Sequence, residues 1–124
     1  MQFTVNLTTA AMARATDFCG VRSGRDCDKW KATGLHPYPG QTVSCPAVAE
    51  SPLSLECRVK TIMPLGSHDM FIADVVNVLA DEAYMNPDTG KFEMERAGLM
   101  SYSHGGYYTQ GDLLGTFGFS VKKK

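Results

Sequence analysis

Cysteine and histidine side chains give this 124-residue chain its widest chemical range, since both can bind metals and take part in catalysis. The separations of the cysteines contain no Cys-x-x-Cys pair, the spacing typical of zinc sites. The N-terminus lacks the charged start and apolar stretch of an export signal, so a disulfide framework is not expected either. The sequence therefore predicts no metal site, disfavours a zinc or thiol-redox module, and predicts free thiols at Cys19, Cys27, Cys45 and Cys57.

The three histidines differ in their surroundings. His36 and His104 lie in segments rich in proline or glycine, which predicts surface positions for both. His68 follows Gly66 and Ser67 and directly precedes an apolar stretch, so it lies at the start of a predicted strand. Spacing by itself favours a structural histidine here, with its ring bonded to a backbone carbonyl. A ligand-binding role for His68 needs support from a longer pattern.

Antiparallel strands are predicted around His68. Residues 53–63 begin with strict alternation of apolar and polar side chains, which is typical of a strand with one buried and one solvated face. Residues 68–80 are more uniformly apolar, which favours a strand with the core on one face and a partner on the other. The short connection at 64–67 predicts a hairpin. We expect its inward-facing residues to include Leu55, Cys57 and Val59.

Other elements are predicted from local signals. A further strand covers residues 3–7, and a helix runs from about Thr9 to Cys19, with Thr8 or Thr9 as its N-cap and Gly20 as its C-cap. A short second helix, capped within residues 23–26, ends at Gly34 and carries Cys27, Trp30 and Lys31.

The rest of the chain reads mainly as loops and turns. Proline-rich residues 35–52 are mostly loop or extended, and residues 86–90 form a turn. The segment 98–118 is irregular and leads to a final short strand over Phe117–Val121. Together these signals predict an α+β domain that is mainly antiparallel strands, with helices near its start.

Composition and charge exclude several classes of function. Twelve basic and thirteen acidic residues give a formal charge of −1, without the clustered basic stripe of a nucleic-acid surface. No apolar run is long enough to span a membrane. The length predicts a single domain over residues 1–124. With no export signal, the cytoplasm is the default location.

Four stretches, in their order and spacing, resemble the flavin reductase-like (flavoredoxin-type) family. The resemblance extends from Phe3 to the terminal lysines. Its most informative part is Gly66-Ser67-His68, which is similar to a Gly-Asp-His motif of the wider reductase group. In this chain Ser67 replaces the aspartate, and Ala73 replaces a glycine that follows the motif. The four stretches are 15–30 (ATDFCGVRSGRDCDKW), 49–59 (AESPLSLECRV), 65–75 (LGSHDMFIADV) and 107–123.

This resemblance implies a six-stranded split β-barrel that forms a homodimer and holds FMN near the subunit interface. It implies an oxidoreductase that passes electrons from NAD(P)H through flavin to an acceptor. The residues that it assigns to cofactor binding are Gly66, Ser67 and His68, with the histidine beside the flavin and the nicotinamide.

One difference from the family affects this interpretation. The chain begins where the family's middle strand begins, so the N-terminal strands that grip the flavin are expected to be missing and the barrel incomplete. An alternative hypothesis is therefore a truncated, non-catalytic subunit that dimerises without binding flavin. In either case we expect open sheet edges and an uncovered apolar face on the monomer.

Overall fold

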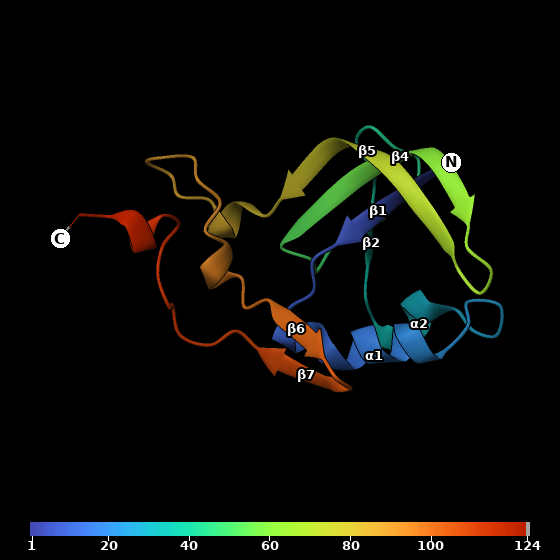
Figure 1. Ribbon diagram of the computed structural model, residues 1–124. Helices are drawn as coiled ribbons and strands as arrows, with labels where there is room; N and C mark the ends of the chain where they lie inside the picture. The colour runs from blue at the N-terminus through green and yellow to red at the C-terminus, as the bar shows by residue number, and fades with distance from the viewer. Residues whose placement is uncertain (124) are drawn as a thin grey trace.

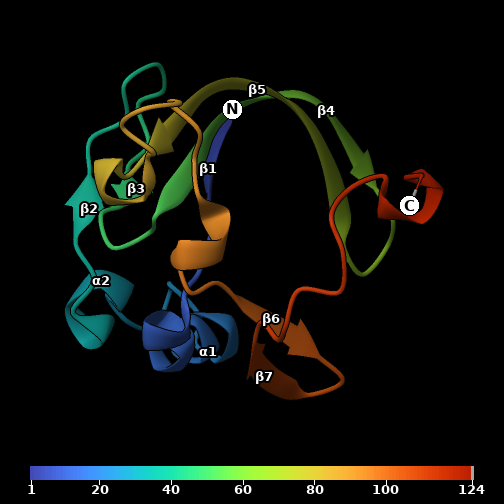
Figure 2. The ribbon, with the colours of Figure 1, turned by 90° about the vertical axis from the view of Figure 1, so that its left-hand side faces the viewer.

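The computed structural model describes residues 1–123, and its main element is a three-stranded antiparallel sheet (Figure 1). The strands are β1 (Gln2–Asn6), β4 (Leu53–Pro64) and β5 (Asp69–Ala80), in the order β1-β4-β5. The predicted hairpin is confirmed, because β4 and β5 pair along their whole length with two register shifts. Figure 2 shows this hairpin as a long arch, with the helices below one of its ends.

Smaller elements surround the sheet. Two short hairpins pair β2 (Pro37–Tyr38) with β3 (Ala47–Val48), and β6 (Met100–Ser103) with β7 (Gly106–Thr109). The α-helices are α1 (Ala13–Val21) and α2 (Lys29–Thr33), and four 3₁₀ turns are η1 (Ala10–Met12), η2 (Glu82–Tyr84), η3 (Met94–Arg96) and η4 (Phe119–Val121).

The helix predictions are right in position and wrong at both ends of α1 and at the start of α2. A 3₁₀ turn precedes α1, and Thr9 before that turn makes no side-chain cap. Gly20 lies inside α1, and Arg22 occupies the C-cap position. For α2, Asp28 is the N-cap, since its carboxylate accepts a hydrogen bond from the Lys31 amide, so Cys27 lies outside this helix.

The end of α2 is confirmed: Gly34 has a φ of 72°, a left-handed conformation that glycine adopts without strain. The predicted turn at 86–90 is also present, closed by a hydrogen bond from the Gly90 amide to the Asn86 carbonyl.

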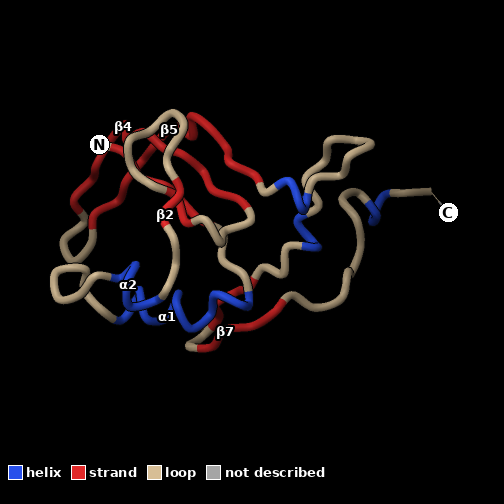
Figure 3. The backbone as a smooth tube through the Cα atoms, turned by 180° about the vertical axis from the view of Figure 1, so that it is seen from behind, coloured by secondary structure: helices blue, strands red, loops and turns tan. Residues whose placement is uncertain are grey.

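The C-terminal predictions need correction. Residues 117–121 do not form a strand; a 3₁₀ turn lies there, and Phe117 is fully exposed. The segment predicted as irregular contains the β6–β7 hairpin, which the Tyr107 hydroxyl fixes to α1 through a 3.0 Å bond to Asp17. Figure 3 shows the chain beyond β7 running as a loop away from the sheet. The aromatic residues at 117–121 favour a strand locally, but no neighbouring strand lies there to pair with their backbone.

The two faces of the sheet differ sharply in chemistry, since residues paired across antiparallel strands share a face. The apolar face consists of Phe3, Val5, Leu53, Leu55, Cys57, Val59, Ala73, Val75, Val78 and Ala80. The polar face consists of Gln2, Thr4, Asn6, Ser54, Glu56, Arg58, Asp74, Asn77 and Leu79.

Burial corrects the predicted orientation of β4. Cys57 is buried as expected and Arg58 is exposed, but Leu55 and Val59 are only half-buried. On the polar face, Ser54 is 3% exposed and Glu56 is fully buried. The reason is that loop 40–46 lies over the middle of the polar face and hydrogen-bonds to it, an arrangement that alternation within β4 does not encode.

Candidate functional site

The residues that the sequence assigns to cofactor binding lie at the tip of the β4–β5 hairpin. Gly66 has a φ of 95°, which suits the first central position of a tight hairpin turn. The Leu65 amide donates to the His68 carbonyl over 2.9 Å and closes the turn. His68 is exposed, and its Nδ1 lies 2.9 Å from the Ser67 hydroxyl. This contact orients the ring, and Nε2 makes no hydrogen bond within residues 1–123.

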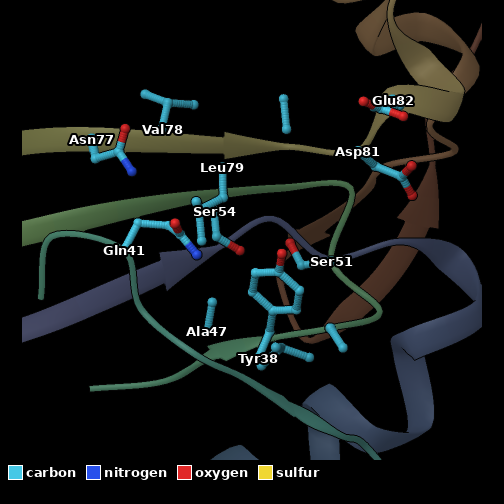
Figure 4. Close-up of a pocket in the computed structure, with 13 residues that line it drawn as sticks. Tyr38, Gln41, Ala47, Ser51, Ser54, Asn77, Val78, Leu79, Asp81 and Glu82 are labelled. Carbon is cyan, nitrogen blue, oxygen red and sulfur yellow. The ribbon is translucent and has the colours of Figure 1, made fainter. Parts of the chain in front are cut away.

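A polar cavity of about 670 Å³ lies toward the other end of β5 (Figure 4). Asn77 and Leu79 point from β5 toward the cavity, whereas Val78 points away from it. The opposite wall comes from β2, β3 and the segments beside them, including Tyr38 and Ser51. The lining combines hydroxyl and amide side chains with apolar residues, and the acidic Asp81 and Glu82 follow the end of β5, so the cavity offers both hydrogen-bonding groups and negative charge.

The cavity and the predicted site are separate. His68 lies nine positions before Asn77 along the chain, and eight residues of β5 separate them, a contour length on the order of 30 Å. The fold therefore brings Gly66, Ser67 and His68 together with one another and places them away from this cavity. His36 and His104 are exposed, as predicted, and His36 Nδ1 contacts the Glu50 carboxylate at 2.5 Å.

Glu56 is the feature that sequence analysis missed. Its two carboxylate oxygens accept hydrogen bonds from the Gln41 amide (2.6 Å), the Thr42 amide (3.1 Å) and the Thr42 hydroxyl (2.8 Å). A fourth donor, Asn77 Nδ2, lies 2.8 Å away and links β5 to the same carboxylate. The network holds loop 40–46 on the sheet beside the polar cavity. A single glutamate in an alternating strand gives no signal of such burial.

The charge state of Glu56 follows from these contacts. Burial by itself raises its pKa, but the hydrogen bonds from Asn77, Gln41 and Thr42 outweigh burial and lower the pKa from 4.5 to about 2. Glu56 is therefore ionised at neutral pH. Nearby, the Arg58 guanidinium donates to the Thr42 carbonyl over 2.8 Å, which adds a further contact between loop and sheet.

We expect Glu56→Gln to lower the melting temperature by about 5 °C at pH 7. The amide has the same shape, but its NH₂ group would meet backbone and side-chain donors. Because the folded-state pKa of Glu56 lies below the unfolded value of 4.5, its stabilisation is present above that pH and is lost as the pH falls toward 2. Thermal melts from pH 7 to pH 2 test both points. The variant should lose less stability than the wild type over that acid range; equal losses would contradict the assignment.

The cysteines and the other possible metal ligands were also considered as functional groups. All four cysteines are free, and burial and Cys45 raise the pKa of the Cys57 thiol, which suppresses its reactivity. Among residues 1–123, no three His, Cys, Asp or Glu side chains gather closely enough to hold a metal ion. In the same range, no helix is sufficiently long and apolar to cross a membrane.

The fold is that of the split-barrel flavin proteins, which confirms the predicted fold class. A putative flavin reductase with a split barrel domain from Shewanella frigidimarina superposes with a TM-score of 0.77 at 22% identity, over 93% of this chain and 59% of that one. In this chain the sheet is not closed, since β1 and β5 each have a free edge in residues 1–123.

The chain belongs to the flavin reductase-like family, because the family description "Flavin reductase like domain" matches residues 1–110. Flavoredoxin of Desulfovibrio vulgaris (Miyazaki F) is 28% identical with a TM-score of 0.86, over 98% of this chain and 65% of that one. Flavoredoxin from Methanosarcina acetivorans is 27% identical with a TM-score of 0.82, over 98% and 64%. An uncharacterized protein of Deinococcus radiodurans is 30% identical over 79% of this chain and 43% of its own length. The chain thus spans less than two thirds of each of these proteins.

Proposed function

We propose that this protein is an FMN-binding oxidoreductase of the flavin reductase class, with residues 1–124 acting as one domain. The observation that carries the proposal is the likeness to flavoredoxin over nearly the whole chain. An FMN-binding protein from Thermus thermophilus with the same fold adds support for the cofactor. Electrons would pass from NAD(P)H to flavin and then to an acceptor, and bound flavin would supply the hydride chemistry.

Within this proposal, the chain's own residues orient and shield the reactants. His68 would contact the nicotinamide or the flavin edge through Nε2, since Nδ1 faces the Ser67 hydroxyl. Gly66 would allow the turn that presents both side chains. A homodimer would place a second chain near the flavin, and the cytoplasmic location stays a prediction.

The uncovered apolar face and the free sheet edges favour a second candidate: a non-catalytic split-barrel subunit that dimerises without flavin. Purification and FMN titration separate the two candidates. We expect FMN to bind with a micromolar or tighter Kd and to give the oxidised-flavin absorbance at about 450 nm. The opposite result is a protein that stays colourless and does not quench FMN fluorescence saturably at about 100 µM protein. That result would reject the proposal of an FMN-binding oxidoreductase and support the non-catalytic subunit.

A further inference from the structure

A cavity of about 540 Å³ lies at the two α-helices, and no residue of the β4–β5 hairpin lines it. Figures 1 and 2 show α1 and α2 side by side. One wall comes from η1 and α1, where Ala11, Ala15 and Phe18 share a face because they recur at helical spacing. A second wall comes from the end of α2 and from Leu35 after it. The volume is typical of ligand pockets, and these walls suit the hydrocarbon part of a small molecule.

Two opposite charges line the same cavity. Arg14 belongs to α1, and Glu50 follows β3. The two side chains form no ion pair with each other, and Arg14 forms none with any residue in 1–123. The first turn of α1 also has no acidic side chain that would balance the arginine. Arg14 therefore offers the cavity a guanidinium whose charge the described chain does not neutralise.

Glu50 is held by His36, which does not line the cavity. The His36 amide donates to both carboxylate oxygens over 3.1 Å, and its ring Nδ1 contacts one of them. A carboxylate has about four acceptor sites, so these three contacts leave capacity for a donor from a ligand. Burial raises the pKa of Glu50, but the hydrogen bonds from the His36 ring and amide outweigh burial and lower the pKa below 4.5. The cavity thus carries an ionised carboxylate at neutral pH.

We propose that this cavity binds a free α-amino acid with an apolar side chain. The Arg14 guanidinium would bind the α-carboxylate through two parallel hydrogen bonds, and Glu50 would accept from the α-ammonium group. The walls at Ala15 and Phe18 would hold the apolar side chain. A ligand with only one of the two charges would leave the other charge of the cavity unmatched, which selects against it. The inference goes beyond the proposed electron transfer and requires no flavin.

Isothermal titration calorimetry without added flavin tests the site with L-phenylalanine, 3-phenylpropanoate, which lacks the ammonium group, and 2-phenylethylamine, which lacks the carboxylate. We expect phenylalanine to bind with a Kd of about 100 µM or below, and each of the others about tenfold or more weakly, because each loses one charged contact. Arg14→Gln should weaken phenylalanine binding about tenfold and leave 2-phenylethylamine binding little changed. Glu50→Gln should weaken phenylalanine binding to a similar extent and leave 3-phenylpropanoate binding little changed.

Arg22→Gln is the matched control and should keep the wild-type affinity, since Arg22 is exposed at the other end of α1 and does not line the cavity. Arg14 is also exposed, so its replacement should leave the fold intact, which circular dichroism checks. Ala15→Leu, which fills the cavity and keeps both charges, should also weaken phenylalanine binding by about tenfold.

Three results would each overturn the proposal. The first is no saturable binding of phenylalanine at about 5 mM. The second is equally tight binding of 3-phenylpropanoate or 2-phenylethylamine, which would show that one charge is sufficient. The third is an equal effect of Arg14→Gln and Arg22→Gln, which would indicate attraction by surface charge in general. Because no flavin is present, these outcomes are independent of the FMN titration.

Discussion

Replacing Gly40 with alanine is expected to lower the free energy of unfolding by about 3 kcal/mol. A Cβ atom at this position would lie 2.2 Å from the Val43 carbonyl oxygen and 2.8 Å from that of Cys45. Both are backbone atoms, and a third neighbour, Glu56 Oε1, lies 3.0 Å away within the hydrogen-bonded network. The added methyl group would push loop 40–46 off the polar face. Urea unfolding followed by circular dichroism measures the change.

Gly20 provides the control for this substitution. It lies inside α1, and a Cβ there would meet no atom within 4 Å. Gly20→Ala should raise stability by about 0.5–1 kcal/mol, because alanine restricts the unfolded chain and favours the helix. If Gly40→Ala is as stable as the wild type, loop 40–46 is not held closely against Glu56, and the structural role assigned to this carboxylate fails.

Replacing His68 with alanine is expected to reduce kcat/KM for NAD(P)H by roughly 10–100-fold while flavin affinity changes little. Loss of one orienting polar contact costs about 1–3 kcal/mol, which corresponds to this range. The side chain is exposed at the hairpin tip and makes no core contact that alanine would remove, so the fold should persist. Steady-state kinetics beside an FMN titration separates turnover from cofactor binding.

Ser67→Ala refines the test of His68. Its hydroxyl lies 2.9 Å from His68 Nδ1 and leaves the other ring nitrogen free. If Ser67 acts only by orienting the ring, its removal should have a smaller effect than His68→Ala, and it should have no effect in the His68→Ala background. Unchanged turnover in His68→Ala would show that this histidine has only a structural role at the strand end. Parallel loss of flavin and turnover would indicate that it holds the cofactor.

Local patterns in the sequence were enough to predict the framework. Alternation in residues 53–60 and the short connection at 64–67 define the β4–β5 hairpin, because strand period and turn length are local properties. Gly34 marks the end of α2 for a similar reason, since a left-handed residue favours glycine. The order and spacing of longer stretches identified the family, which the match to residues 1–110 confirms.

Tertiary structure alone decided which face of the sheet is covered. Alternation shows that a strand has one apolar and one polar face, but it does not show which face other segments cover. Here the polar face is covered by a loop whose Gln41 and Thr42 lie 15 and 14 residues before Glu56. That loop supplies donors that make burial of a carboxylate favourable, so the polar face became the buried one. The placement of Gly66–His68 far from the polar cavity likewise follows from the length of β5 and its pairing. Sequence determined the strands and the family; packing between distant segments determined the buried glutamate and the uncovered apolar face.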